Sequence, residues 1–564
     1  MQKKIIKKSL YHKIIYFFPF QLLLLNLRQN YAMMFFWALL FLAVLNSIGT
    51  KYGIPYLYLS PEYLGYVSFW SFFIVGFSLG GFVMAFNISC YIQGGSSFPF
   101  LATISKPFAR FCTNNSLIPL AFIITYLISA YRFLSKNEAM SGEKIGLLIA
   151  GLPVGYTLFI VLSMAYFMAT NKDFIKIFGK DAAKIISSKS KGKEPARMVL
   201  HRRKKTWFER SLFDRTCRVD SYLGSRLRLR MSRPFGHYDE NMLSQVFRQN
   251  HINASFFEVV IILSIIALGF FRSFEVFEIP AGATTLLFFT MSIMLVSAVR
   301  SWLHEWTIFV LLALFLIINF VSRYDKFYFS NRAYGISYDE KALYQDSVLE
   351  TVYQDTMDHQ RDLREIYKVL DKWKAGRNSM EGKPKAVFIT TSGGGSRAAL
   401  WTMHAMQYLN EELNGKLMDQ SIMITGSSGG MIGAAYFREL YRLNSPDLYD
   451  KERAMALGKD LLNPIVLSMA TSDIIRFQKF SYNGEKYWKD RGHAFEQRLN
   501  EITQGKMDIP LSAYRNAEEE AEIPMMVLSP SVVSDGRRLL ISPLSMSFLY
   551  SFHSSENLNM ETNV

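Results

Sequence analysis

Two short glycine-rich segments hold the residues of this 564-residue chain that could do chemistry. In the sequence Gly-Ser-Ser-Gly-Gly of residues 426–430, Ser428 has a glycine two positions before it and another two positions after it. An apolar run precedes this segment and a helix-compatible stretch, 431–443, follows it. The pattern predicts a serine on a sharp strand-to-helix bend, where larger neighbours would collide with adjacent backbone. A serine at the positive end of a helix is suited to attack a carbonyl group.

The second segment is Ser-Gly-Gly-Gly-Ser-Arg at residues 392–397. Residues 385–391 before it have the pattern of a buried strand, and residues 398–413 after it favour a helix. Bare backbone at Gly393, Gly394 and Gly395 could present N–H donors to the oxyanion that forms during acyl transfer. Arg397 would add a fixed positive charge or brace the loop. The two segments together predict a serine acyl-transfer site.

In their order along the chain, the two segments resemble the patatin-like phospholipase family, whose domain has a strand, a G-G-G-x-R oxyanion loop, a helix and then a G-x-S-x-G elbow. The resemblance covers the chain from about residue 385 onward. It implies that Gly393, Gly394 and Gly395 stabilise the oxyanion and that Ser428 accepts the acyl group. The expected function is that of a serine acyl hydrolase acting on membrane lipids or other acyl esters. No metal or organic cofactor is implied.

The general base is less well defined by the sequence. Patatin-like enzymes pair the serine with an aspartate in a D-G-[GA] motif, and Asp535-Gly536 is the only Asp-Gly pair after the elbow. The next residue is Arg537, which departs from the family pattern. Asp-Gly is also a common hairpin dipeptide. Three interpretations therefore stay open: Asp535 is the base of a Ser/Asp dyad, it is a structural turn, or the hydrolase domain is C-terminally incomplete and its base follows Val564.

Other chemistries for these segments are less well supported. A Ser/His mechanism would use His404, His493 or His553, none of which has a recognisable catalytic setting. Residues 393–398 also fit the dinucleotide fingerprint G-x-G-x-x-A, but the next predicted strand ends in Thr425-Gly-Ser and lacks the acidic residue that would hold a ribose. A phosphate-binding P-loop would need Gly-Lys-Ser/Thr after the glycines.

The remaining pattern after residue 323 predicts a helical linker over 324–384 and an α/β domain over 385–564. Strand patterns recur at 524–529 and 538–542, and helical patterns alternate with them. The further helical patterns cover 344–374, 451–461 and 494–503. This alternation predicts a three-layer α/β sandwich of patatin-like type, with ligands bound at the carboxyl ends of the strands.

Residues 1–323 have the composition of an α-helical membrane bundle, because several uncharged runs are long enough to cross a bilayer. The clearest runs are 31–50, 66–91, 117–131, 145–169 and 281–299. Residues 253–271 and 306–322 are either further spans or interfacial or buried helices, and 14–27 could lie in the interface. A multi-pass integral membrane protein is expected. The side of the membrane that carries the α/β domain stays open, since it depends on these two uncertain runs.

Charge is divided unevenly along the chain. Of the 63 Lys and Arg residues, 35 lie in 1–323 and 28 in 324–564, whereas the 47 Asp and Glu residues divide as 15 and 32. The loop 172–252 holds 20 basic and 8 acidic residues. A basic loop between spans is typical of a positive-inside signal and of contact with anionic lipid head groups. Nucleic-acid binding is not expected, because the basic charge is the sole feature of the sequence that would support it.

Cysteine usage excludes some classes of site from the α/β domain. The three cysteines, Cys90, Cys112 and Cys217, all lie in residues 1–323. The sequence therefore predicts neither a disulfide framework nor a thiolate metal cluster after residue 323. Two alternatives to an active hydrolase remain: a non-catalytic membrane scaffold that keeps the α/β fold, and a transport protein whose helical part is coupled to the α/β domain.

Overall fold

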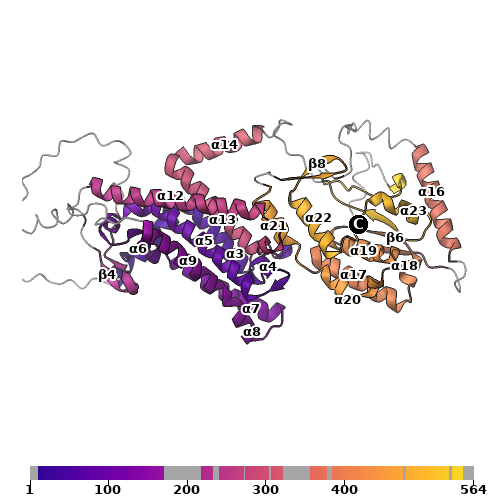
Figure 1. Ribbon diagram of the computed structural model, residues 1–564, viewed down its shortest axis with the longest axis horizontal. Coiled ribbons are helices and arrows are strands. Elements are labelled where there is room, and N and C mark those ends of the chain that lie inside the picture. Colours follow the sequence, from indigo (N-terminus) through magenta and orange to yellow (C-terminus); the bar gives the residue numbers. More distant parts are fainter. Residues whose placement is uncertain are drawn as a thin grey trace, which may run out of the picture. The chain divides into compact units, whose positions relative to one another are not determined.

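The computed structural model describes residues 10–170, 217–232, 235, 240–271, 274–303, 306–321, 334, 356–377, 384–473, 478–532 and 536–549. The chain divides into two compact units (Figure 1). The first, which we call the helical unit, contains Met1–Asn331 and Asn463–Gln478. The second, which we call the α/β unit, contains Arg332–Leu462 and Lys479–Val564. The predicted combination of an apolar helical region with a later parallel sheet is confirmed.

The helical unit consists mainly of helices that are rich in apolar residues. Its N-terminal helices are α1 (Leu10–Ile15), α2 (Phe18–Gln29), α3 (Tyr31–Val44), α4 (Ile54–Leu59), α5 (Phe69–Gly94), α6 (Pro107–Asn114), α7 (Leu117–Asn137), α8 (Gly142–Ile149) and α9 (Gly151–Thr170). Later helices are α12 (Glu240–Phe270), α13 (Ala281–Leu303), α14 (Thr307–Val321) and α21 (Leu462–Ala470). Short hairpins join some of them, β1 (Glu62–Tyr63) with β2 (Tyr66–Val67) and β3 (Ser221–Leu223) with β4 (Leu229–Met231).

Within the described ranges, three helices are long and apolar enough to cross a membrane: Phe69–Ser97, Leu117–Asn137 and Gly142–Thr170. They correspond to three of the predicted spans. The run predicted at 31–50 is instead α3, which bends by 100° from α2 and passes the same test only together with it. The other predicted spans contain shorter apolar helices, Phe257–Phe270, Ala281–Ser297 and Leu312–Val321. Membrane association is thus supported, and a multi-pass topology stays a prediction.

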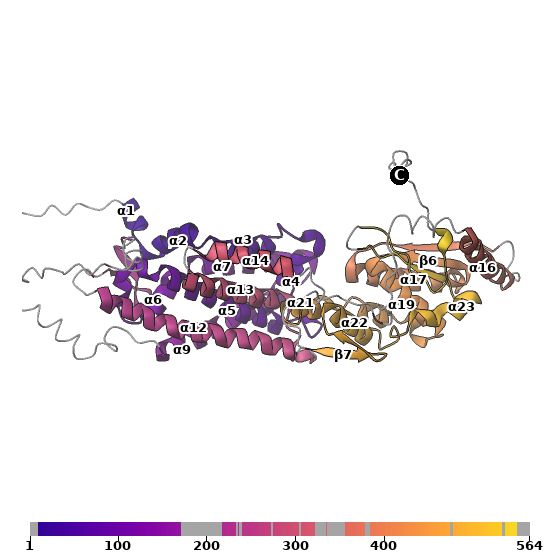
Figure 2. The same cartoon turned by 90° about the horizontal axis from the view of Figure 1, so that it is seen from above.

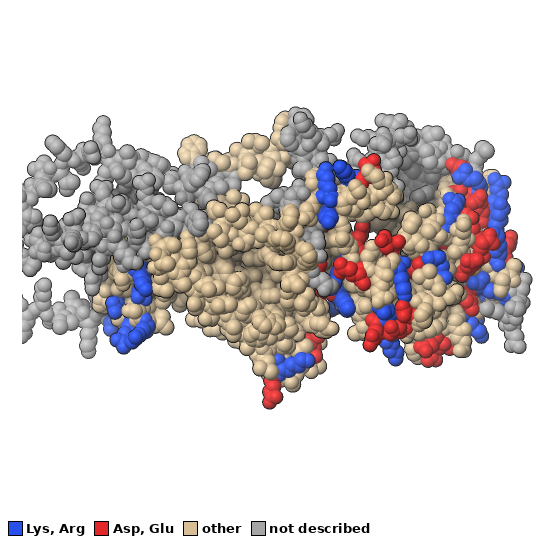
Figure 3. Space-filling model, viewed as in Figure 1, with Lys and Arg blue, Asp and Glu red and all other residues tan. Residues whose placement is uncertain are grey.

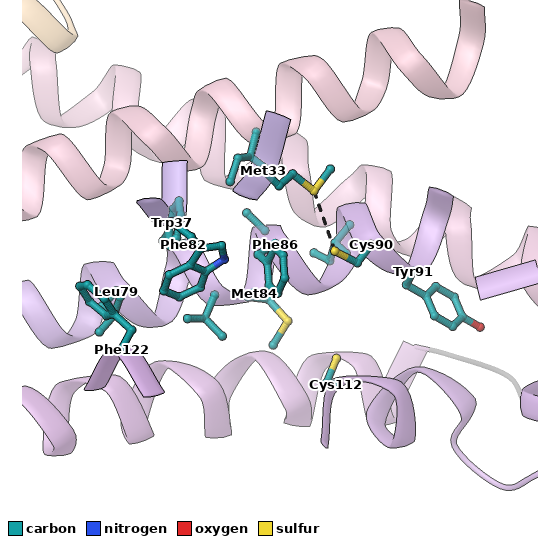
Figure 4. Packing of buried hydrophobic residues seen from close by; sticks show 14 of the residues in the cluster. Met33, Trp37, Leu79, Phe82, Met84, Phe86, Cys90, Tyr91, Cys112 and Phe122 are labelled. Carbon is teal, nitrogen blue, oxygen red and sulfur yellow. Dashed lines mark hydrogen bonds between the residues drawn. The ribbon is translucent and has the colours of Figure 1, made fainter. Parts of the chain in front are cut away.

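Helix α5 forms the centre of the helical unit. Its side chains meet those of α3 and α7 in an aromatic cluster, in which the Trp37 ring lies 5.0 Å from Phe82 and 5.4 Å from Phe122 (Figure 4). Helix α9 approaches α5 so closely that a Cβ on Gly76 or Gly155 would overlap a backbone carbonyl of the other helix. Small residues at such a contact let two helices pack without a hydrophobic driving force between them.

A chain of buried asparagines crosses this apolar core. Asn30 donates to Asn26 at 2.8 Å, Asn26 donates to Asn115 at 2.8 Å, and Asn115 donates to Asn87 at 2.9 Å. All four side chains are buried. Unpaired amides would be costly here, so the chain connects the α2–α3 bend to α5 and to the residues between α6 and α7.

The charged residues of the described surface are distributed as the composition predicts. The described face of the helical bundle is almost free of charge, apart from basic side chains near β4 and a few charges near α8 (Figure 3). Arg226, Arg228 and Arg230 are exposed around the β3–β4 hairpin. Residues 171–216, which hold most of the predicted basic loop, lie outside the described residues.

The α/β unit contains a parallel sheet formed, in its described part, by β5 (Val387–Thr391), β6 (Ser421–Gly426) and β9 (Met525–Leu528), in the order β5-β6-β9. Its helices are α16 (Thr356–Ala375), α17 (Gly395–Glu412), α18 (Lys416–Gln420), α19 (Ser428–Arg442), α20 (Lys451–Ala456), α22 (Arg491–Ile502) and α23 (Arg515–Glu519). Strands β7 (Lys479–Tyr482) and β8 (Glu485–Trp488) form a hairpin. The strand predicted at 538–542 is reduced to two antiparallel bridges, Ser531 with Arg538 and Leu528 with Ile541.

Helices cover both faces of this sheet because side chains alternate along each strand. On one face, Ile424 and Met526 pack into a core with residues of α17 and α19. On the other face, Met525 and Val527 pack against α16, around Trp373. Helix α16 lies within the range predicted as a linker, and it contributes to this core. Figure 2 shows the place of α16 in the α/β unit. The arrangement brings the carboxyl ends of β5 and β6 side by side.

Candidate active site

Ser428 lies where β6 ends and α19 begins. It is the first residue of α19, and its φ of +55° is in the left-handed region that non-glycine residues seldom adopt. Both Ser428 and its neighbour Ser427 are exposed. Backbone held in such a conformation is typical of functional turns, in which the surrounding structure offsets a cost of about 1–3 kcal/mol. The predicted sharp bend at position 428 is therefore present, with the serine accessible to solvent.

The glycines that flank Ser428 are required by the end of the neighbouring strand. Gly426 has a φ of +156°, and a Cβ there would overlap Thr391 at the end of β5. A Cβ on Gly430 would overlap the carbonyl oxygen of Ser392. The spacing of two glycines around the serine thus has a steric cause, since both must fit against the turn that leaves β5.

The glycine loop after β5 lies directly against the serine. A Cβ on Gly393 would be 3.3 Å from the Cβ of Ser428 and 3.7 Å from its Oγ. Gly394 is the N-cap of α17 with a φ of +151°, and Gly395, with a φ of +64°, is its first residue. The two segments identified in the sequence therefore meet in space, although residues 393 and 428 are separated by α17, α18 and β6.

Two helix N-termini converge at this meeting point. Helix α17 begins at Gly395 and α19 begins at Ser428, and a Cβ on Gly429 would overlap the Gly395 carbonyl. The first N–H groups of a helix have no partner within the helix and carry partial positive charge. An oxyanion near Ser428 could therefore accept hydrogen bonds from loop amides and from the amide of Gly429. Gly429 was not among the sequence-predicted donors, although the residue after the nucleophile commonly supplies one.

Arg397 occupies the first turn of α17 and is exposed. It therefore follows the glycine loop directly in sequence and lies at the N-terminal end of the helix that this loop begins. A guanidinium there adds positive charge to the end of α17 that carries the glycine loop.

Asp535 lies outside the described residues. The residues on both sides of it form a hairpin, in which Val532 N–H donates to the Arg537 carbonyl at 2.7 Å and Gly536 has a φ of +75°. The hairpin leaves β9 next to the elbow, since the Ser529 amide donates to the Gly426 carbonyl at 3.3 Å. The role of Asp535, as a turn residue or as the base, therefore stays a prediction.

The candidate histidines have settings of different kinds. His404 is half-buried on α17, about two turns after the glycine loop. His493 is buried in the first turn of α22, where its ring lies 4.2 Å from that of Phe480. His553 lies outside the described residues. Among the described residues, no hydrogen bond joins the Ser428 hydroxyl to an imidazole or a carboxylate.

A buried ion pair supports the helix that carries the serine. Arg438 of α19 and Glu518 of α23 are both fully buried, and Arg438 donates to Glu518 at 2.5 Å and to the Pro524 carbonyl at 2.7 Å. The Met526 amide of β9 donates to the same carboxylate oxygen at 3.1 Å. Burial raises the pKa of Glu518 to about 7, although the Arg438 charge opposes this shift. The pair connects α19 to β9, and nothing in the local sequence indicated it.

Comparison of the chain with protein-family models, with curated protein sequences and with solved structures gives no match. The assignment to a class of protein therefore depends on the geometry of the site and on the sequence motifs. The patatin-like resemblance stays a prediction at this point.

Proposed function

We propose that the chain is a membrane-tethered serine acyl hydrolase, a lipid esterase or phospholipase of patatin-like type, with Ser428 as its nucleophile. The observation that supports this most strongly is the contact between the elbow and the glycine loop. Ser428 has a left-handed φ of +55°, is exposed, and has Gly393 directly against its side chain. The sheet with helices on both faces is consistent with the three-layer sandwich that this class of enzyme would use.

In the proposed reaction, the Ser428 oxygen forms a bond to the ester carbonyl carbon while its proton moves to a base. The carbonyl oxygen becomes negatively charged and accepts hydrogen bonds from amides of residues 393–395 and of Gly429. Collapse of this intermediate breaks the bond to the alcohol or lysolipid, which leaves with a proton. Water then attacks the acyl enzyme by the same route and releases a carboxylic acid. Asp535 is the candidate base, because it stands in the Asp-Gly pair that follows the elbow in the sequence.

The helical unit gives this chemistry a physical rationale. Three of its helices are long and apolar enough to cross a membrane, within the ranges that the structure describes. A tethered serine is held at high effective concentration near a substrate that does not dissolve in water. Anionic lipid head groups are the proposed partners of the exposed arginines around the β3–β4 hairpin and of the rest of the basic loop 172–252.

The second candidate is a membrane scaffold that keeps the α/β fold without catalysis. It is favoured by the lack, among described residues, of a carboxylate or imidazole hydrogen-bonded to the Ser428 hydroxyl. This lack does not exclude catalysis, because in many enzymes the hydrogen bond between nucleophile and base tightens only when substrate binds. Turnover separates the two candidates.

The test is hydrolysis of a soluble short-chain ester and of a phospholipid by the full-length protein in detergent. Ser428→Ala should lower turnover by roughly six orders of magnitude, as loss of the nucleophile does in serine hydrolases. The matched control is Ser427→Ala, which removes the adjacent exposed hydroxyl and should leave turnover near the wild-type rate. Asp535→Asn should behave like Ser428→Ala if Asp535 is the base. Equal activity of Ser428→Ala and wild type, or no activity in either, would favour the scaffold.

A further inference from the structure

The bend between α2 and α3 is a break in an apolar helical segment at a buried polar residue. The two helices are long and apolar enough for a membrane span only as a pair, and they meet at 100°. Asn30 lies at the bend, since it caps both the end of α2 and the beginning of α3. Its side chain is buried, with 1% exposed. Broken membrane helices are a recurrent place for ion binding, because polar groups at the break are not used within a helix.

The buried asparagine chain of the helical unit has its acceptor end at this bend. Asn30 donates to Asn26, and Asn26 donates to Asn115. Asn115 in turn donates to Asn87, so the four side-chain amides are aligned in one direction. Hydrogen bonds in series polarise one another, which makes the oxygen at the negative end a better acceptor. That oxygen is Asn30 Oδ1, and it accepts no hydrogen bond from the described residues. The series therefore favours a positively charged group at Asn30.

Helix α5 brings further polar groups to the bend. The Asn30 amide nitrogen lies 3.5 Å from the Cys90 sulfur, which also lies 3.9 Å from the sulfur of Met33 (Figure 4). Ser89, the residue before Cys90, is fully buried, and its hydroxyl has no hydrogen-bond partner among the described residues. Gln93 lies one turn further along the same face as Ser89. Within the same ranges, both polar atoms of its amide group are buried and unpaired.

Helix α13 supplies another hydroxyl. The helix starts against α4, where a Cβ on Gly282 would overlap a backbone carbonyl, and its Phe289 ring lies 5.0 Å from that of Phe36. Since α4 follows the C-terminal end of α3, α13 runs toward the N-terminal end of α3. At 1.5 Å per residue, Ser297 lies about 12 Å beyond Phe289, and Asn30 lies about 9 Å beyond Phe36 in the same direction. Ser297 is fully buried, and its hydroxyl is unpaired in the described part of the chain.

We infer that these groups form a binding site for an alkali-metal cation, with Asn30 Oδ1 and the hydroxyls of Ser89 and Ser297 as oxygen ligands. Half-buried Gln93 can supply a further oxygen. Neutral oxygens that replace the hydration shell are the usual ligands of sodium and potassium in membrane proteins. Divalent and transition metals are not favoured, because the described residues contain no group of three or more His, Cys, Asp or Glu that could hold one. The inference concerns the helical unit alone and does not depend on the proposed function.

Two substitutions test the site with little risk to the fold. Ser297→Ala and Ser89→Ala each remove a buried hydroxyl that makes no hydrogen bond within the described residues. Both variants should therefore melt at or above the wild-type temperature when no binding ion is present, since an unpaired polar group is lost. The matched control is Ser292→Ala on α13, whose hydroxyl donates to the Phe288 carbonyl of its own helix at 2.9 Å.

The experiment compares the full-length proteins in detergent, at constant ionic strength, in sodium, potassium, lithium and choline chloride. The melting temperature of the wild type should rise with the concentration of an alkali cation above its value in choline, as expected when a ligand binds the folded state. Binding of radiolabelled sodium, with potassium and lithium as competitors, gives the affinities.

Ser297→Ala and Ser89→Ala should weaken binding of the preferred ion by roughly 10- to 100-fold, the loss typical when a partner of a metal site is removed. Ser292→Ala should bind it like the wild type. Equal melting temperatures of the wild type in alkali and choline salts would overturn the inference. Wild-type affinity in either Ser297→Ala or Ser89→Ala would also overturn the site as assigned.

Discussion

Substitution of Gly393 by alanine gives a graded test of how closely the glycine loop approaches the serine. The added Cβ would lie 3.3 Å from the Cβ of Ser428 and 3.7 Å from its Oγ. The first distance is shorter than ordinary van der Waals contact by a few tenths of an ångström, so the loop or the serine must move by about that amount. The φ of Gly393 is not in the left-handed region, and alanine adds no backbone strain there.

The expected cost follows from the displacement. A misplacement of about 1 Å can lower a rate by roughly 100-fold, so a shift of a few tenths of an ångström should lower it by about 3- to 10-fold. The assay is the second-order rate constant for labelling by a fluorophosphonate, with the folded fraction measured by thermal melting. Gly393→Ala should melt close to wild type and be labelled more slowly by that factor.

The matched control is Gly505→Ala, in the turn after α22 and outside the site. Gly505 has a φ of +74°, and a Cβ there would meet nothing within 4 Å. Alanine should therefore cost about 1–2 kcal/mol of stability through backbone strain, with a labelling rate per folded molecule near that of wild type. Labelling of folded Gly393→Ala at the wild-type rate would refute the close approach of the loop to the nucleophile. Equal slowing in both variants would also refute it.

Two further predictions concern buried polar groups. The raised pKa of Glu518, about 7 against 4.5 in the unfolded chain, means that the folded state binds the proton more tightly. Its contribution to the unfolding free energy should therefore grow as pH falls from about 7 toward 4.5, by roughly 3 kcal/mol in total. The measurement is the urea midpoint for unfolding of the α/β unit as a function of pH. Glu518→Gln should remove this pH dependence. In the helical unit, Asn115→Leu leaves the Asn26 donor and the Asn87 acceptor unpaired, and should lower stability by roughly 2–5 kcal/mol in detergent unfolding. Thr125→Ala on α7, whose hydroxyl bonds within its own exposed helix turn, should change it little.

The parts of the site that could be predicted are those whose cause is local. The spacing of Gly426, Ser428 and Gly430 predicts a sharp bend between a strand and the next helix. Such a bend leaves no room for a Cβ at the two glycine positions, so the glycines themselves indicate it. Strands β5 and β6 were expected because apolar runs end at these turns. Since parallel strands bring their carboxyl ends to one edge of a sheet, the meeting of residues 393 and 428 also followed.

The parts that could not be predicted depend on partners far apart in the sequence. Arg438 and Glu518 are separated by 80 residues, and neither residue type at its position indicates the other. Asn463 contacts residues 182 and 401 positions away, so the docking of α21 in the helical unit had no local signal. The 100° bend between α2 and α3 carries a hydrogen bond from Asn26 to Asn115, which lies 89 positions away between α6 and α7, whereas hydropathy alone predicted a span through residues 31–50.

The central claim is that the hydroxyl at position 428 is a reactive nucleophile in front of backbone amides. The most direct measurement is mass-spectrometric mapping of the adduct formed when the full-length protein reacts with a fluorophosphonate. A single adduct on Ser428 is predicted, retained in Ser427→Ala and lost in Ser428→Ala. An unlabelled wild-type protein, or an adduct on another serine that persists in Ser428→Ala, would contradict the account.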